Sequence, residues 1–525
     1  MKRIQVLDCT LRDGGYCNDC HFGFDNTKRI VNSLVEANID IIECGFFTDI
    51  IQYDRDRTRF TSMEEVAAVI PEEKSGKLFV MLTDYGQFDP SELPEYDGSS
   101  VDGLRIAFHK KDRFAGLEDC KIVKEKGYKV FIQAMVSLSY SDEEFLDLIH
   151  RVNELEPYAF YIVDSFGVMK SKDLTRLFYL VEHNLKESIC IGFHSHNNMQ
   201  LAYSNAQSLV DEHTDRRLII DSSVYGMGRG AGNLNTELFV EYLNENADGN
   251  YNLKPLLTII DEILNDFYER NRWGYSLPNY LSAKHNTHPN YAGYLDAKKT
   301  LTVESMDEIF SMMADDKRIN YDQKYIEELY TRYMATGRVQ ESHLAELKEK
   351  IRGKDVLIIA PGKSVNDEED KVIACAKTKV DISIGINFDY FGCDTDYIFL
   401  SNLRRYRELE EGKRAKCIVT SNIPSVDCYL QTKYSELLND IDAVRDNAGM
   451  MLIKYLIQLG ARKVYVAGID GYSTDASQNF ADEKMNFYTQ KAVFEAMNEG
   501  ITKVMKQFGQ YIIIEYVTTP KHVCP

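Results

Sequence analysis

Two short motifs, far apart in the chain, carry residues that could bind a metal ion. The first, D-C-T-L-R-D-G, runs from Asp8 to Gly14, and the second, F-H-S-H-N, runs from Phe193 to Asn197. His194 and His196 are two residues apart, so on a β-strand both imidazoles point to the same face. Two neutral imidazoles and one carboxylate, here Asp13, form a divalent-metal site with open positions for a substrate. The alternative is that Asp13 caps a helix and that both histidines are ordinary strand-end residues.

The elements that must position these motifs are short apolar strands that alternate with amphipathic helical segments. Eight strand–helix repeats predict a (β/α)8 TIM barrel with a parallel sheet, and a doubly wound sheet is the alternative. The predicted strands are Ile4–Thr10, Ile41–Phe47, Leu78–Leu82, Gly103–Phe108, Lys129–Val136, Ala159–Asp164, Ile189–His194 and Leu218–Val224.

Polar side chains gather directly after these strands. In a TIM barrel the site lies at the carboxyl ends of the strands, so these residues are expected on one rim although they are far apart in sequence. They are Asp13, Glu43, His109, Asp164, Ser165, His194, His196 and Asn233.

The chain is longer than a single hydrophobic core usually supports, and its pattern changes twice. We expect a TIM-barrel domain over residues 1–250, a helical extension or lid over 251–352, and a separate Rossmann-like α/β domain over 353–525. The strands predicted for the last domain are Asp355–Ala360, Asp381–Ile386, Tyr397–Leu400, Cys417–Thr420 and Lys463–Gly468, with a long helix over Asn447–Leu459 that ends at Gly460.

Composition excludes several classes of partner. The formal charge of −21 argues against nucleic acid, which requires clustered Lys and Arg. No stretch approaches the roughly 20 apolar residues that span a bilayer, and no apolar signal core is evident near the start, so we expect a cytoplasmic protein.

The eleven scattered cysteines suit reduced thiols better than a disulfide framework. We also expect a homo-oligomer.

The first ~300 residues resemble the metal-dependent aldolase and lyase superfamily that includes 4-hydroxy-2-oxovalerate aldolase, hydroxymethylglutaryl-CoA lyase and isopropylmalate synthase. The matching motifs are D-C-T-L-R-D-G, V-D-S-F-G at 163–167, F-H-S-H-N-N at 193–198 and D-S-S-V-Y-G-M-G-R-G-A-G-N at 221–233. The resemblance implies that Asp13, His194 and His196 bind the metal. It also implies that Asn233 is a ligand or near-ligand and that Arg12 stabilises an enolate.

This chemistry explains the residue types. Cleaving or forming a carbon–carbon bond next to a ketone develops negative charge on an enolate oxygen, which a divalent ion and a guanidinium both stabilise. The expected substrates are therefore a small 2-oxo acid, such as pyruvate, and an aldehyde. Mn²⁺ is the metal we expect, while Mg²⁺, Co²⁺, Zn²⁺ and iron also suit these ligands.

The sequence departs from the aldolase pattern at the general base. In the aldolase branch a histidine follows the R-D-G turn, but here Gly15 and Tyr16 occupy these positions. Tyr16 could act through its phenol, although an ordinary phenol with a pKa near ~10 is a poor base at neutral pH. Our preferred substitute is His288, in H-N-T-H-P-N-Y-A-G-Y at 285–294, on a segment that could close over the site. The alternative is a loop at a helix start with packed aromatic residues.

The C-terminal part contains weaker signals for phosphate binding. I-I-A-P-G-K-S at 358–364 reads as a strand, a glycine turn and a helix start, where backbone N–H groups could hold a phosphate. With I-G-I-N at 384–387 and V-Y-V-A-G-I-D at 464–470, it resembles Rossmann-like bacterial sialyltransferases and pterin-pyrophosphokinase-like domains. The resemblance implies a nucleotide or nucleotide-sugar pocket lined by Gly362, Ser364, Asn387 and Asp470.

Together these patterns predict a bifunctional enzyme. Its barrel would be a metal-dependent aldolase that acts on 4-hydroxy-2-oxo acids, and its second domain would handle a related sugar or acid, for example in polysaccharide biosynthesis. One alternative is a Claisen-type condensation of an acyl-CoA with a 2-oxo acid at the same metal site. Another is a glycosyltransferase-like nucleotide-sugar-binding protein whose barrel is chiefly structural.

Overall fold

The structure is a computed structural model that describes residues 3–298, 300–335, 343–390, 392–423, 426–486 and 491–523. The chain forms two compact units. Unit 1 comprises residues 1–293 together with 318–321, and unit 2 comprises residues 294–317 together with 322–525. The segment 251–352 is therefore divided between the two units.

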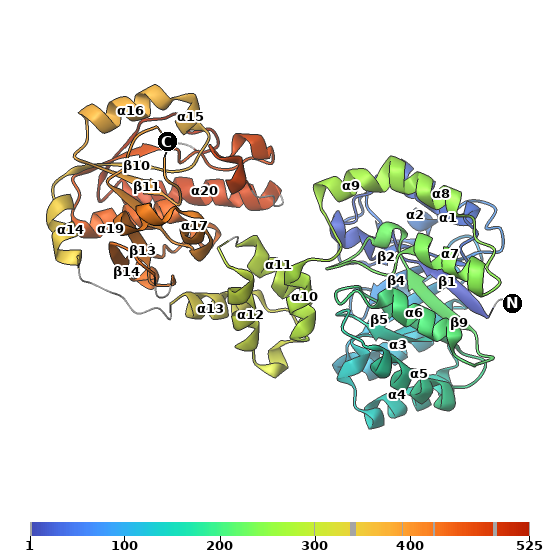
Figure 1. The fold of residues 1–525 in the computed structure, drawn as a ribbon. Coiled ribbons are helices and arrows are strands. Elements are labelled where there is room, and N and C mark those ends of the chain that lie inside the picture. Colours follow the sequence, from blue (N-terminus) through green and yellow to red (C-terminus); the bar gives the residue numbers. More distant parts are fainter. Residues whose placement is uncertain are drawn as a thin grey trace. The chain divides into compact units, whose positions relative to one another are not determined.

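Unit 1 is a parallel barrel, which confirms the predicted TIM-barrel fold (Figure 1). All eight predicted strands are present among the described residues, and pairing of the first strand with both the second and the last closes the sheet. A two-residue strand, β3, extends the sheet beyond β2. The strands are β1 (Ile4–Asp8), β2 (Ile41–Phe47), β3 (Arg59–Phe60), β4 (Leu78–Asp84), β5 (Gly103–Phe108), β6 (Lys129–Ala134), β7 (Ala159–Asp164), β8 (Cys190–Ser195) and β9 (Leu218–Ser222).

Alternation of side chains along the strands creates two apolar layers. Leu7, Phe131 and Tyr161 point into the barrel and pack in its interior. Their neighbours Val6 and Val130 point outward and pack under the surrounding helices. Since successive residues of a strand face opposite sides, continuous apolar strands are required when both faces are buried.

Helices cover the outside of the barrel and extend unit 1 beyond the last strand (Figure 1). The helix α4 begins with a capping box, in which Ser141 and Glu144 satisfy each other's backbone N–H groups. The helices are α1 (Phe24–Glu36), α2 (Met63–Ala67), α3 (Arg113–Glu125), α4 (Asp142–Leu155), α5 (Ser171–Asn184), α6 (Ala202–Asp211), α7 (Thr236–Asn246), α8 (Leu253–Ile259), α9 (Asn265–Arg270), α10 (Leu277–Lys284) and α11 (Pro289–Ala297), which continues into unit 2.

Unit 2 contains a second parallel sheet, with strand order β14-β13-β12-β11-β10-β15-β16 among the described residues. The chain order reverses between β10 and β15, which makes this the point where helices switch from one face of the sheet to the other. The strands are β10 (Asp355–Ile359), β11 (Ile382–Ile386), β12 (Tyr397–Leu400), β13 (Cys417–Thr420), β14 (Leu430–Thr432), β15 (Lys463–Ala467) and β16 (Ile513–Tyr516).

The helices of unit 2 include the predicted long helix, here α19, which Asn447 caps at its start. Gly460 ends it in the left-handed conformation (φ 80°) that glycine adopts without steric cost. The remaining helices are α12 (Val303–Ser311), α13 (Gln323–Met334), α14 (Leu344–Ile351), α15 (Ser364–Asp367), α16 (Glu369–Thr378), α17 (Leu403–Glu408), α18 (Tyr434–Leu437), α19 (Ala448–Leu459) and α20 (Lys491–Phe508). None of the helices in the described segments is both long and apolar enough to cross a bilayer.

Candidate metal centre

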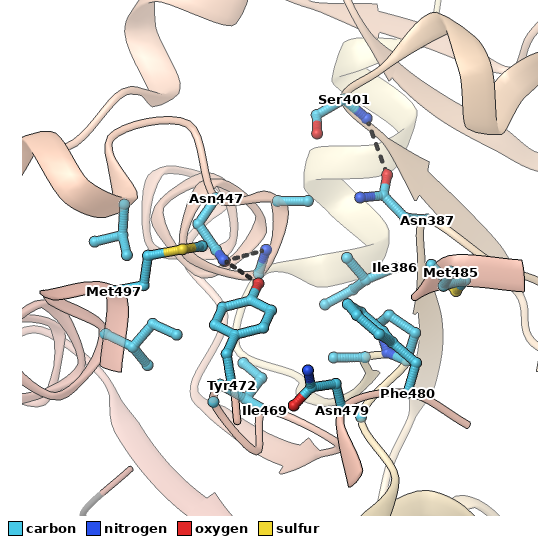
Figure 2. Close-up of a pocket in the computed structure, with 18 of the residues that line it drawn as sticks. Ile386, Asn387, Ser401, Asn447, Ile469, Tyr472, Asn479, Phe480, Met485 and Met497 are labelled. Carbon is cyan, nitrogen blue, oxygen red and sulfur yellow. Dashed lines mark hydrogen bonds between the residues drawn. The ribbon is translucent and has the colours of Figure 1, made fainter. Parts of the chain in front are cut away.

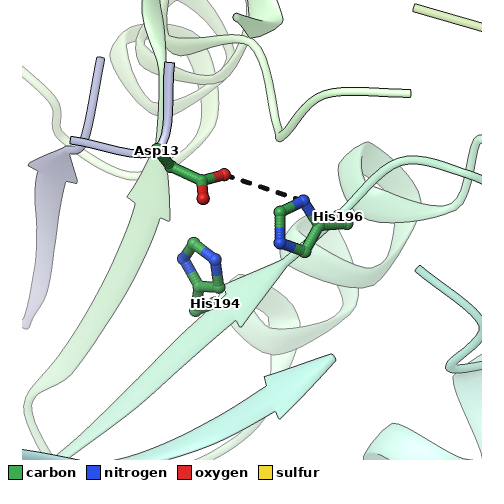
Figure 3. A group of neighbouring side chains, drawn as sticks. All are labelled: Asp13, His194 and His196. Atoms are coloured by element: carbon green, nitrogen blue, oxygen red, sulfur yellow. Dashed lines mark ion pairs between the residues drawn. The ribbon is translucent and has the colours of Figure 1, made fainter. Parts of the chain in front are cut away.

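Asp13, His194 and His196 converge at the carboxyl end of the barrel (Figure 3). Their ligand atoms all lie within 4.8 Å of one another, and all three side chains are buried. Ligands that sit about 2.0–2.2 Å from one ion are at most roughly 4.4 Å apart, so the cluster needs only a small contraction to share an ion. The two histidines flank Ser195 at the end of β8, and their same-face orientation follows from the strand alternation that the sequence predicted.

The surroundings of the two histidines suit metal binding. His194 Nδ1 lies 2.9 Å from Asp221 Oδ2, which leaves Nε2 available to an ion, an arrangement common among metal-bound histidines. His196 Nδ1 is buried without a hydrogen-bond partner and lies 3.7 Å from Asp13 Oδ2. Burial lowers the pKa of His196 to about 3, so its imidazole is neutral, as a ligand must be. Despite its burial, the pKa of Asp13 is held well below its usual range by His196 and Arg12.

A buried chain of charges connects the metal cluster to the strands around it. Arg12 donates from Nη1 to Asp13 Oδ1 and from Nε to Glu43 Oε2, both at 2.8 Å. Glu43 also accepts from Arg105 Nη1 at 2.8 Å, and Arg105 pairs in turn with Asp221. Since Asp221 contacts His194, acids and guanidinium groups alternate from one metal ligand to the other. These buried ion pairs hold the side chains of the metal ligands in position in the absence of an ion.

Asn233 lies beside the cluster, as the resemblance implied. Its amide Nδ2 donates to Asp13 Oδ2 at 2.6 Å and to the carbonyl of Met227, while its Oδ1 has no partner among the described residues. Gly228, in the same loop, lies so close that a Cβ there would sit 2.3 Å from Asn233 Nδ2 and 3.0 Å from Asp13 Oδ2. The glycines of this run therefore let the backbone pack directly against the metal cluster.

The cluster opens into a cavity of about 320 Å³, which is at the lower end for small-molecule sites. Its walls bring together all the residues that the sequence assigned to catalysis or metal binding at this site except Asn233, which lies beside the cluster. These are Arg12, Asp13, Tyr16, His194, His196 and His288.

Burial determines the protonation states of the two proton-transfer candidates. Desolvation in the pocket raises the pKa of Tyr16 to about 12, so its phenol stays protonated. Burial, followed by the repulsion of Arg229, lowers the pKa of His288 to about 3, so its ring is neutral. His288 Nδ1 accepts a hydrogen bond from the backbone N–H of Asn290 at 3.2 Å, which places the ring proton on Nε2. Both groups are thus hydrogen-bond donors.

Three further residues of the pocket escaped the sequence analysis. Asp84, at the end of β4, lines the pocket; its carboxylate forms no ion pair among the described residues, and burial raises its pKa. Gln133, on β6, lines the floor, and its buried Nε2 has no partner among the described residues. Arg229 belongs to the glycine-rich run that follows β9. Position after a strand could have indicated Asp84, whereas a lone Gln or Arg gives no comparable signal.

Unit 2 has a cavity of its own, of about 200 Å³ (Figure 2). It lies at the carboxyl ends of β10, β11, β12 and β15, next to the switch point of the sheet, where open α/β sheets bind ligands. Gly362, Asn387 and Asp470 line it. Ser364 does not line it; its backbone N–H and hydroxyl instead donate to Asp470 at 2.7 and 2.6 Å. Asp470 therefore holds the glycine turn in place.

The cavity of unit 2 combines aromatic and amide groups with a helix terminus. Figure 2 shows Tyr472 and Phe480 with Asn447, which donates from Nδ2 to the Tyr472 hydroxyl at 3.4 Å. Asn447 caps α19, whose first residues, Ala448 and Gly449, also line the cavity. The positive end of the helix dipole is thus directed at this space.

Comparison with known proteins agrees with the motifs in the barrel. Residues 114–263 match the HMGL-like family model, a range that includes both histidines and the glycine-rich run. The 4-hydroxy-2-oxovalerate aldolase of Geobacillus thermodenitrificans is 29% identical over 247 residues, which is 46% of this chain and 70% of the relative. The enzyme of the same name from Geobacillus stearothermophilus is 27% identical over 269 residues, 50% of this chain and 76% of the relative.

Solved structures extend the comparison to the fold. The N-terminal domain of a "putative aldolase" from Bacteroides vulgatus superposes with a TM-score of 0.51 at 27% identity, covering 58% of this chain and 99% of that domain. Rhizobium etli pyruvate carboxylase shares the fold with a TM-score of 0.50 at 14% identity, covering 67% of this chain and 35% of that one. The matches therefore support the predicted similarity of the barrel to the HMGL-like TIM-barrel aldolases and lyases.

Proposed function

We propose that unit 1 is a divalent-metal-dependent aldolase that acts on 4-hydroxy-2-oxo acids. The observation that carries this proposal is the buried cluster of Asp13, His194 and His196, which opens into a cavity that Arg12 also lines. The relatives named 4-hydroxy-2-oxovalerate aldolase support the same class of reaction. In the cleavage direction the C3–C4 bond breaks, the C4 hydroxyl loses a proton, C3 gains one, and an aldehyde and a 2-oxo acid leave. Mn²⁺ is the metal we propose, with Mg²⁺, Co²⁺ and Zn²⁺ as the other ions that this ligand set accepts.

A divalent cation bound to this cluster would act as a Lewis acid toward the keto oxygen of the 2-oxo acid. Arg12 supplies a second positive group. Its Nε and Nη1 are occupied by Glu43 and Asp13, so the guanidinium is held rigidly and Nη2 remains for the ligand. Burial disfavours the charged form, but both carboxylates raise the pKa of Arg12 further above its ordinary value. Arg12 therefore stabilises negative charge on the substrate and does not exchange protons.

Proton transfer requires one acceptor and one donor in the pocket. We assign the acceptor role to Asp84, because its carboxylate lines the pocket and makes no hydrogen bond among the described residues. Its raised pKa also makes it a stronger base than an ordinary aspartate. Once protonated, Asp84 is also the donor that returns this proton to C3. His288 through Nε2 and Tyr16 through its hydroxyl donate hydrogen bonds to the substrate and keep their own protons. This assignment modifies our initial hypothesis that His288 is the base.

Substitution of the metal ligands tests the proposal. We expect Asp13→Ala and His194→Ala to lose bound metal, measured by elemental analysis, and to lose cleavage of 4-hydroxy-2-oxo acids, measured as pyruvate release. His183→Ala on α5 is the matched control, since 68% of that side chain is exposed and it lies outside the pocket. Full metal content and full turnover in both ligand variants would exclude the proposal.

We further propose that unit 2 is a Rossmann-like domain that binds a nucleotide or nucleotide sugar, which would make the protein bifunctional. The cavity at the switch point of its sheet, with the N-terminus of α19 and the rings of Tyr472 and Phe480, supports this ligand class. Aromatic faces suit a base, and the helix terminus suits a phosphate. A cytoplasmic homo-oligomer with a role in polysaccharide biosynthesis is the setting we propose.

A further inference from the structure

Arg229 lies in the glycine-rich loop that packs against the metal cluster. Its neighbours in the loop are Gly228, whose backbone closely approaches Asp13, and Gly230, whose φ of +66° is costly for other residues. The backbone amide of Ala231 donates to Asn198 Oδ1 at 2.9 Å and so ties the loop to the segment that follows β8. The loop therefore places one long cationic side chain at the edge of the metal site.

Arg229 differs from Arg12 and Arg105 in that it makes no contact ion pair among the described residues. Arg12 contacts two carboxylates, Asp13 and Glu43, and Arg105 also contacts two. By contrast, no carboxylate of the described segments lies within ion-pair distance of Arg229. Asp13 and Asp84 feel the charge of Arg229 only at longer range, so no acid of the described segments holds the donors of its guanidinium.

The contacts of Arg229 hold it over the pocket without using up its donors. Nη2 donates to the carbonyl of Ser165 at 3.3 Å, and the guanidinium lies 5.4 Å from the ring centroid of Tyr16. Its Nε is buried and has no hydrogen-bond partner among the described residues. Arg229 also lines the same cavity as His194 and His196. A planar guanidinium with free donors at such a place matches a carboxylate, which it can bind in bidentate fashion.

We propose that Arg229 binds the carboxylate of the 2-oxo acid and so selects 2-oxo acids over ketones and esters that lack this charge. The inference rests on the proposed function of unit 1 and adds a specificity residue to it. Gln133, with its unpartnered Nε2 on the floor of the pocket, provides a second donor to an oxygen of the same ligand. Arg229 and Gln133 therefore give one pocket two hydrogen-bond donors for the oxygens of an anionic ligand.

Equilibrium binding tests the inference without turnover. The dissociation constants of pyruvate and of methyl pyruvate are measured by titration calorimetry on the full chain loaded with Mn²⁺. We expect Arg229→Gln to weaken pyruvate binding about tenfold or more, and to change the binding of methyl pyruvate less than about twofold. Arg229→Lys should fall between Arg229→Gln and the unaltered chain, since it keeps the charge but loses the planar fork.

Controls separate this inference from the aldolase proposal. Arg151→Gln, on the exposed face of α4, should bind pyruvate like the unaltered chain, and elemental analysis should give equal manganese in all variants. Unchanged pyruvate affinity in Arg229→Gln, or equal weakening of pyruvate and its methyl ester, would overturn the role of Arg229 alone. Failure of the unaltered chain to bind any of Mn²⁺, Mg²⁺, Co²⁺ and Zn²⁺ would overturn the aldolase proposal as well. If Arg229→Gln does not fold, pyruvate affinity in Arg229→Lys equal to that of the unaltered chain would still refute the inference.

Discussion

At the scale of single residues, the barrel pocket separates groups that hold charge from groups that move protons. Arg12 stays charged because Asp13 and Glu43 surround it. Tyr16 keeps its proton and His288 is neutral. Asp84 is different, since burial raises its pKa while the charge of Arg12 only partly offsets that rise. A carboxylate with a raised pKa accepts a proton near neutral pH more readily than an ordinary aspartate does.

We therefore predict that Asp84→Asn lowers kcat for aldol cleavage at least about 100-fold while metal content stays unchanged. A base must be deprotonated, so activity of the unaltered chain should fall as the pH drops through the pKa of Asp84. Because that pKa is raised, the fall should occur at a higher pH than for an ordinary aspartate. This acid limb should disappear from the residual activity of Asp84→Asn. Pyruvate release measured across the pH range, with the exposed Asp147→Asn as control, provides the test.

At the scale of elements, buried charges connect four strands of the barrel. Glu43 on β2 contacts Arg105 on β5, and Arg105 contacts Asp221 on β9, which contacts His194 on β8. Arg105 is fully buried and also lies 4.8 Å from the ring centroid of Tyr161. Removing the central cation would leave two acids facing each other inside the barrel, which is more costly than losing a surface pair.

We predict that Arg105→Met lowers the free energy of unfolding by about 3–5 kcal/mol, measured by urea denaturation of unit 1. Arg151→Met on α4 removes an exposed arginine and should cost less than about 1 kcal/mol. The double variant Arg105→Met with Glu43→Gln should lose less than the sum of the two single changes, because it removes one of the uncompensated acids. Additive losses would show that Arg105 and Glu43 are not coupled.

The elements that sequence predicts best are those with local signals. The eight barrel strands were identifiable because each is a short apolar run between helical patterns, and the H-x-H spacing already placed His194 and His196 on one face. The edge strands β14 and β16 were missed, since β14 has three residues and β16 is partly exposed. The contacts of Arg105 and Arg229 depend on residues more than 50 positions away, and no local pattern specifies such partners.

At the scale of the whole molecule, each compact unit has its own parallel sheet and apolar core. In unit 1 the core fills the barrel and the layer outside it, and in unit 2 residues such as Leu357 and Val372 pack on the open sheet. Each unit also has a separate cavity at the carboxyl ends of its strands. Units with separate cores unfold independently unless their interface is strong, and a ligand stabilises the unit that binds it.

We predict two calorimetric transitions that respond to different ligands. Mn²⁺ with pyruvate should raise the Tm of one transition only, and a nucleotide such as CMP should raise only the other. A ligand at 100 times its Kd stabilises its unit by about 2.7 kcal/mol, which is a readily measured shift. In His194→Ala the response to Mn²⁺ with pyruvate should vanish while the response to CMP persists, because His194 lies in unit 1 and the second cavity is lined by unit 2. A shift of both transitions by one ligand would instead show that the two units are energetically coupled.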